Sequence, residues 1–203
     1  MPDGLPEAAY QHIHGRFTEE ERSVERDELL ELYRRASDWT LGKVAVASDH
    51  LDAGTGCDGW DVRTLLNHML ETQRYFAGSA RGEDVSPPGA EPPDLLGAVP
   101  LADFTRTRDE VLRAFAEDGA LERTGPALGI AFSDQLLHGW DLATATGQDA
   151  RMPDGLPEAA YQHIHGRFTE EERQGVFKAE IPVPTDASPQ QRLLAYTGRA
   201  TSA

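Results

Sequence analysis

The chain has 203 residues, of which 39% are hydrophobic and 27% charged, and this composition is typical of one globular domain with a buried core. Its formal net charge is −16, from 35 acidic and 19 basic side chains. A surface of that sign repels phosphate backbones and anionic lipids, so we expect neither nucleic acid nor a membrane as a partner. The single cysteine, Cys57, excludes an intrachain disulfide, and no run approaches the roughly 20 apolar residues of a membrane span. We therefore expect a cytoplasmic protein.

The chain contains an exact internal repeat. Residues 1–22 and residues 152–173 both read MPDGLPEAAYQHIHGRFTEEER. Solenoid repeats are numerous and diverged, so one isolated perfect copy indicates a recent duplication or an artificially introduced segment. We therefore divide the chain into an extra copy, residues 1–22, and a folded domain over residues 23–203.

The second copy has the pattern of a docked helix. Pro157 suits a first helical turn, and an apolar residue recurs every four positions at Leu156, Ala160, Ile164 and Phe168. Only one copy can occupy a given groove, and the second copy continues into sequence that suits the fold. We expect it to dock, which leaves the first copy as a tail, as a swapped helix in a homodimer, or as part of a folding switch.

Four longer segments carry apolar residues at helical spacing. They run from about Thr18 to Ser48, from Asp61 to Gly78, from Leu101 to Glu117 and from Ile130 to Thr146. The glycine-rich stretch between the first two is expected to be a loop, and the proline-rich stretch 82–100 an extended connection. Near the end, Ser188 and Pro189 begin a short helix that Gly198 stops. Period-two alternation is almost absent, so the sequence predicts an all-α helix bundle.

Two of these helices carry side chains that suit a metal ion. Asp134 and His138 are four residues apart and share one helix face, and His68 lies on the second helix. Bundles build metal sites from facing helices, and two imidazoles with one carboxylate suit zinc first, with nickel, iron and manganese as alternatives. Spacing alone also allows a simple hydrogen bond between Asp134 and His138 and a core role for His68.

Four further residues each have two possible interpretations. Asp141 lies one turn beyond His138 and is either a partner or ligand at the site or a solvent-facing or capping residue. Trp60 and Trp140 are expected to pack near the site, with substrate stacking as the alternative. Cys57 is expected to be a small loop residue, with a thiol near the pocket as the alternative.

The remaining polar candidates carry less weight. Arg63 and Arg74 could bind an anionic substrate, but surface positions are expected, and His50 lies in a loop without a partner. Two pairs of histidines diverge on a helix and are not expected to chelate one ion: His12 with His14, and His163 with His165. The chain has no glycine-rich phosphate motif, no HExxH and no nucleophile elbow, so nucleotide binding and serine hydrolysis have no support.

Three motifs in order carry a family resemblance: GWDVRTLLNHM, SDQLLHGWDLATATGQ and SPQQRLLAYTGR. Together they resemble the actinobacterial DinB-like family, in the branch related to mycothiol-dependent maleylpyruvate isomerase, over about Asp27 to Arg199. The resemblance implies an up-down-down-up four-helix bundle with one metal ion held by three side chains, to which the sequence pattern adds the short C-terminal helix and the extended connections. The family's three metal-binding positions match His68, Asp134 and His138.

The same resemblance implies a low-molecular-weight thiol such as mycothiol as a partner, together with a small electrophilic substrate. A metal ion favours the thiolate, which suits a thiol-dependent transferase or isomerase. A metal-bound hydroxide for hydrolysis is a second chemistry at such a site. The alternative outside enzymology is a metal-binding or stress-response bundle without activity. No residue marks maleylpyruvate as the substrate.

Overall fold

The computed structural model describes residues 19–200 of the chain, and this part is helical. Its helices are α2 (Glu19–Ala47), α3 (Val62–Arg81), α4 (Pro100–Ala116), α5 (Ala120–Thr124), α6 (Ala127–Ala145), α7 (Leu156–Ile164), α8 (Glu170–Val176) and α9 (Pro189–Tyr196). The described range has no strand, only an isolated antiparallel bridge between Gly54 and Asp61. The prediction of an all-α fold is confirmed.

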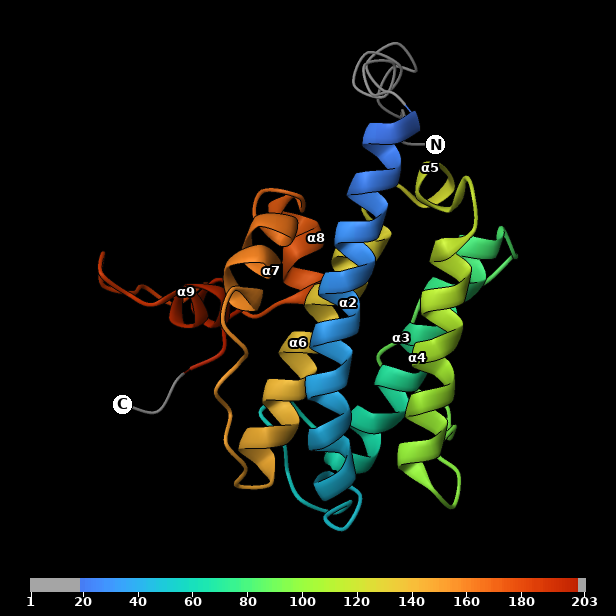
Figure 1. Ribbon diagram of the computed structural model, residues 1–203. Helices are drawn as coiled ribbons and strands as arrows, with labels where there is room; N and C mark the ends of the chain where they lie inside the picture. The colour runs from blue at the N-terminus through green and yellow to red at the C-terminus, as the bar shows by residue number, and fades with distance from the viewer. Residues whose placement is uncertain (1–18, 201–203) are drawn as a thin grey trace.

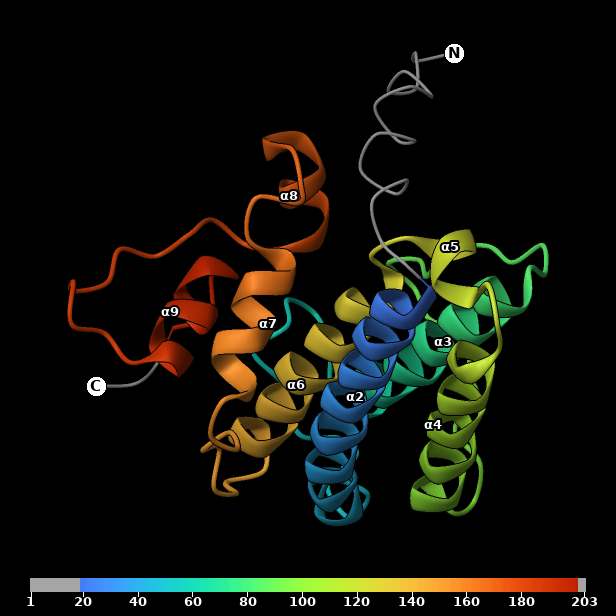
Figure 2. The ribbon, with the colours of Figure 1, turned by 45° about the horizontal axis from the view of Figure 1, so that its top comes forward.

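The longest helices form the predicted up-down-down-up bundle. Figures 1 and 2 show that α3 and α4 run in one direction and α2 and α6 in the other. Helix α2 packs against α4 and α6, and α3 packs against the same two helices. Helix α6 therefore faces α3 as well as α2, which places the two segments with the candidate ligands side by side.

Two consecutive parallel helices need a connection that returns along the bundle, and residues 82–99 provide it. The side chain of Val85 packs over Gly78 near the end of α3. At the other end, the Asn67 side-chain oxygen accepts the backbone N–H groups of Leu95 and Leu96, at 2.7 and 2.8 Å. The proline-rich extended connection predicted from the sequence is thus fixed along α3.

Local signals account for both ends of α3 and for the start of α9. The Asp61 carboxylate accepts the backbone N–H of Thr64 at 2.8 Å and so caps the start of α3. The helix continues to Arg81, three residues beyond the predicted end, because the residue with a left-handed backbone (φ 76°) is Gly82 and not Gly78. Helix α9 begins as predicted, with Ser188 capping it. The short helices α5 and α8 were not predicted.

The interior of the bundle consists of two apolar clusters. The larger one includes Tyr33, Phe115 and Phe132, and the smaller one includes Met69 and Leu142, all of them fully buried. Helix α6 is buried over most of its circumference because α2, α3 and α7 all contact it. A polar side chain on α6 is therefore largely shielded from water unless it faces a gap between these helices.

The second copy of the repeat is docked. Leu156, Ala160 and Ile164 are at most 1% exposed, and α7 packs on α6 and α9. The predicted stripe is wrong at Phe168, because α7 ends at Ile164 and Phe168 lies beyond it, against Phe177 with ring centroids 5.6 Å apart.

Residues 1–18 of the first copy lie outside the described residues, so the prediction that this copy is a tail, a swapped helix or part of a folding switch stays a prediction. Within residues 19–200, no helix combines the length and the apolar character that a membrane crossing needs.

Candidate metal centre

His68 from α3 meets Asp134 and His138 from α6. The His138 Nε2 atom lies 3.4 Å from Asp134 Oδ1, and the His68 and His138 ring centroids are 5.2 Å apart. One ligand atom from each of the three side chains lies within 4.8 Å of the other two. The side chains that the sequence singled out on two separate helices are therefore within reach of a single ion.

Two atoms of this cluster lack a partner. Among the described residues, His68 Nδ1 and Asp134 Oδ2 are buried and form no hydrogen bond. A buried polar atom without a partner costs about 1–3 kcal/mol, so two such atoms in one cluster indicate a ligand that satisfies them. The donor set of two imidazole nitrogens and a carboxylate oxygen fits a divalent cation. The side chains of His138 and Asp134 are 12% and 18% exposed, so the cluster is largely shielded from water.

The electrostatics of the cluster also suit a cation. Burial, with a smaller contribution from His138, lowers the pKa of His68 to about 4. His68 is therefore neutral at pH 7, with a lone pair available. Burial opposes the charged forms of His138 and Asp134, but each stabilises the charge of the other, so the pKa of His138 is raised and that of Asp134 lowered. A divalent cation bound here would supply the positive charge that stabilises the Asp134 carboxylate, in place of protonated His138.

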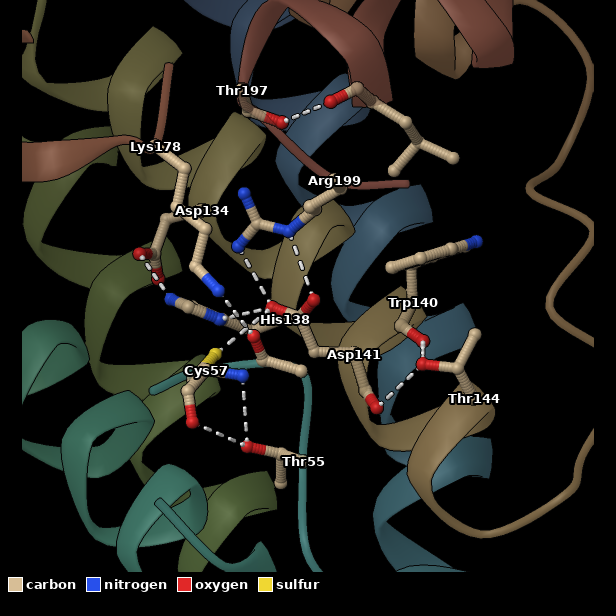
Figure 3. Close-up of polar contacts among 12 residues, drawn as sticks. Thr55, Cys57, Asp134, His138, Trp140, Asp141, Thr144, Lys178, Thr197 and Arg199 are labelled. Atoms are coloured by element: carbon tan, nitrogen blue, oxygen red, sulfur yellow. Dashed lines mark hydrogen bonds and ion pairs between the residues drawn. The ribbon is translucent and has the colours of Figure 1, made fainter. Parts of the chain in front are cut away.

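The second nitrogen of His138 is held by Asp141. Asp141 Oδ2 lies 2.9 Å from His138 Nδ1, and the Asp141 side chain is 2% exposed. Arg199 donates to both oxygens of Asp141, at 2.9 and 2.8 Å (Figure 3). The solvent-facing reading of Asp141 is wrong: this residue orients His138 and directs its Nε2 atom toward Asp134.

Trp60 and Cys57 border the centre, and Trp140 packs in the core of the bundle. The Trp60 ring lies against the His68 ring, with centroids 4.8 Å apart, as expected for a residue that packs near the site. Trp140 is buried in the larger apolar cluster. The Cys57 Sγ atom lies 3.7 Å from Asp141 Oδ2, so this half-buried loop residue borders the Nδ1 side of His138.

The other candidates lie elsewhere on the molecule. Arg63, Arg74 and His50 are exposed, as expected for surface residues. His163 is half-buried against Phe132, and His165 is exposed and stacks on Tyr161. His12 and His14 lie outside the described residues. Sequence reasoning missed Arg199, which is 58 positions from Asp141 in the chain and carries no local signal of this contact.

The fold and the cluster define a class: four-helix bundles in which two histidines and a carboxylate from facing helices form a candidate metal centre. Residues 33–143, more than half of the chain, match the family described as the mycothiol maleylpyruvate isomerase N-terminal domain. The chain belongs to this family, and the matched range contains His68, Asp134 and His138.

Two curated relatives were found, both uncharacterised proteins of Mycobacterium tuberculosis, from strains CDC 1551 / Oshkosh and H37Rv. Each is 28% identical over 185 residues, which cover 84% of this chain and 97% of the relative. No solved structure matches the chain.

Proposed function

We propose that this protein binds one divalent metal ion through His68, Asp134 and His138 and uses it in a thiol-dependent transferase or isomerase reaction. The observation that carries the proposal is the convergence of three ligand atoms within 4.8 Å of one another, two of these side chains having a buried atom that lacks a partner within residues 19–200. Zinc is the first candidate, because it favours nitrogen ligands and is commonly held by three protein groups in catalytic sites. Nickel, iron and manganese are the alternatives.

The chemistry follows from an incomplete set of protein ligands. His68, Asp134 and His138 would hold the metal ion, which would leave a position for a low-molecular-weight thiol of the mycothiol type and would favour its nucleophilic thiolate form. The chain's own part is to supply neutral His68, to keep His138 oriented through Asp141, and to place the Trp60 ring against His68. The acceptor would be an electrophilic carbon of a small substrate.

The metal part of the proposal is tested by elemental analysis of the untreated protein. The wild type is expected to carry about one metal ion per chain, and His68→Ala is expected to lose it. His50→Ala is the matched control, because His50 is an exposed loop histidine that is not among the converging ligand atoms. Full metal content in His68→Ala would overturn the assignment of this site.

The thiol part is tested with cobalt(II) in place of the native metal. Adding a low-molecular-weight thiol is expected to change the visible spectrum of the cobalt protein, because a sulfur atom enters the coordination sphere. Cobalt is also expected to quench the fluorescence of Trp60. The Trp60→Phe variant should lose this quenching, whereas the Trp140→Phe variant should keep it. A cobalt spectrum that no thiol changes would overturn the thiol-dependent reaction and favour a metal-binding bundle without this activity.

A further inference from the structure

We infer that Arg199, in the segment after α9, is a positioning residue for the metal centre: it holds the Asp141 carboxylate, which in turn fixes the His138 ring. The inference rests on the proposed function, because it concerns the same centre. It adds a dependence of metal binding on the C-terminal segment, which contributes none of the three ligands.

The contact between Arg199 and Asp141 is geometrically specific. The Nε atom donates to Oδ1 at 2.9 Å and an Nη atom to Oδ2 at 2.8 Å, so the guanidinium and the carboxylate lie fork to fork. The two side chains are 15% and 2% exposed. A buried carboxylate needs such a partner, and a lysine would supply the charge without the two parallel hydrogen bonds.

One oxygen atom of Asp141 connects Arg199 to His138. Asp141 Oδ2 accepts from Arg199 and also lies 2.9 Å from His138 Nδ1. A carboxylate at that distance favours the proton on Nδ1, which leaves the Nε2 lone pair for a metal. Because Arg199 occupies both carboxylate oxygens, Asp141 is held as the partner of His138 and is not free to swing toward the ion as a competing ligand.

The backbone beside Arg199 packs closely against residues 178 and 179. Gly198 has φ +72°, a conformation that favours glycine, and an added Cβ atom there would lie 2.7 Å from the carbonyl oxygen of Ala179. The neighbouring Lys178 donates to the Gly56 carbonyl at 3.0 Å and to Asp58 at 2.7 Å.

These contacts tie three distant parts of the chain together. The two residues that Lys178 binds, Gly56 and Asp58, flank Cys57 in the sequence. The Cys57 thiol borders Asp141. Figure 3 shows Lys178, Arg199 and Cys57 gathered around His138 and Asp141. The C-terminal segment and the loop before α3 therefore close the Nδ1 side of His138 together.

The test compares Arg199→Gln with Arg192→Gln by cobalt(II) titration of the metal-free protein. Arg192 is an exposed arginine on α9 that pairs with Glu158 at the surface, so it controls for the loss of one positive charge. We expect Arg199→Gln to bind cobalt roughly 10–100-fold more weakly, with a changed visible spectrum, because partners of metal-binding histidines contribute on that scale. Arg199→Lys is expected to recover part of the affinity, and Arg192→Gln to match the wild type.

Wild-type affinity and spectrum in Arg199→Gln would overturn the inference. If circular dichroism shows that this variant does not fold, Asp141→Asn carries the same test, because it keeps the side-chain shape and removes the charge. Wild-type affinity in that variant would equally overturn the inference. A wild-type protein that binds no cobalt would overturn the proposed function and this inference together, so the two failures are distinguishable.

Discussion

The imidazole rings of His68 and His138 lie edge to face, with centroids 5.2 Å apart and an interplanar angle of 85°, although they belong to different helices. Ring nitrogens carry their lone pairs in the ring plane, so two roughly perpendicular rings can direct lone pairs to one point, whereas two stacked parallel rings cannot. Asp134 completes the group from the turn of α6 before His138.

Metal binding should stabilise the fold. A ligand at 100 times its dissociation constant stabilises the folded state by about 2.7 kcal/mol, and for a chain of this size each kcal/mol raises Tm by about 2–4 °C. Zinc added to the metal-free wild type should therefore raise Tm by roughly 5–11 °C in a thermal melt followed by circular dichroism. His50→Ala should keep this increase and His68→Ala should lose it. An equal increase in His68→Ala would place the ion elsewhere.

The close approach of α2 and α6 should depend on Gly139. A Cβ atom at this position would lie 2.5 Å from Thr40 Oγ1 and 2.6 Å from Trp39 Cζ3. Gly139→Ala should cost about 1–3 kcal/mol in urea denaturation, as overpacking of a closely packed contact does.

The matched control for this prediction is Gly42→Ala on α2. Among the described atoms, nothing lies within 4 Å of a Cβ added at Gly42, so this change should stabilise by about 0.5–1 kcal/mol. Equal effects of the two substitutions would show that the contact at Gly139 does not limit the packing.

The cap of α3 should make stability depend on pH. The hydroxyl and the backbone N–H of Thr64, in that order, lower the pKa of Asp61. The folded state thus favours the ionised carboxylate. Its contribution is complete above the ordinary pKa of about 3.9 and is lost as the pH falls through the lower folded pKa.

Asp61→Ala should therefore cost about 0.5–2 kcal/mol at pH 7, as loss of an N-cap does, and less at pH values below the folded pKa. Urea denaturation at pH 7 and at a pH below the folded pKa of Asp61 measures this difference. Asp52→Ala, which removes an exposed acid in the preceding loop, controls for the change in net charge. A cost for Asp61→Ala that is the same at both pH values would contradict the role of the ionised cap.

The two copies of the repeat should differ in their contribution to stability. Leu156 is fully buried in α7, and Leu5 is the equivalent residue of the first copy. Leu156→Ala should cost about 2–5 kcal/mol, whereas Leu5→Ala should stay within about 0.5 kcal/mol. Deletion of residues 1–18 should likewise leave Tm and oligomeric state unchanged, as measured by thermal melts and light scattering. Equal costs of the two substitutions, or dissociation of a dimer on deletion, would show that the first copy also docks.

Local sequence signals account for much of this protein. Apolar spacing predicted the long helices, and Asp61 and Ser188 predicted two of the helix starts. The i,i+4 spacing of Asp134 and His138 was enough to place both side chains on one face of α6, because a helix turn brings such residues together whatever surrounds it.

The tertiary structure decided what those faces meet. Spacing could not show that the His68 ring turns toward α6, because that depends on how α3 packs beside it. Nor could it show that Asp141 is buried against Arg199, which arrives from the far end of the chain. Helix formation depends on neighbours within a few residues, but a coordination shell and its supporting contacts depend on side chains that packing alone brings together.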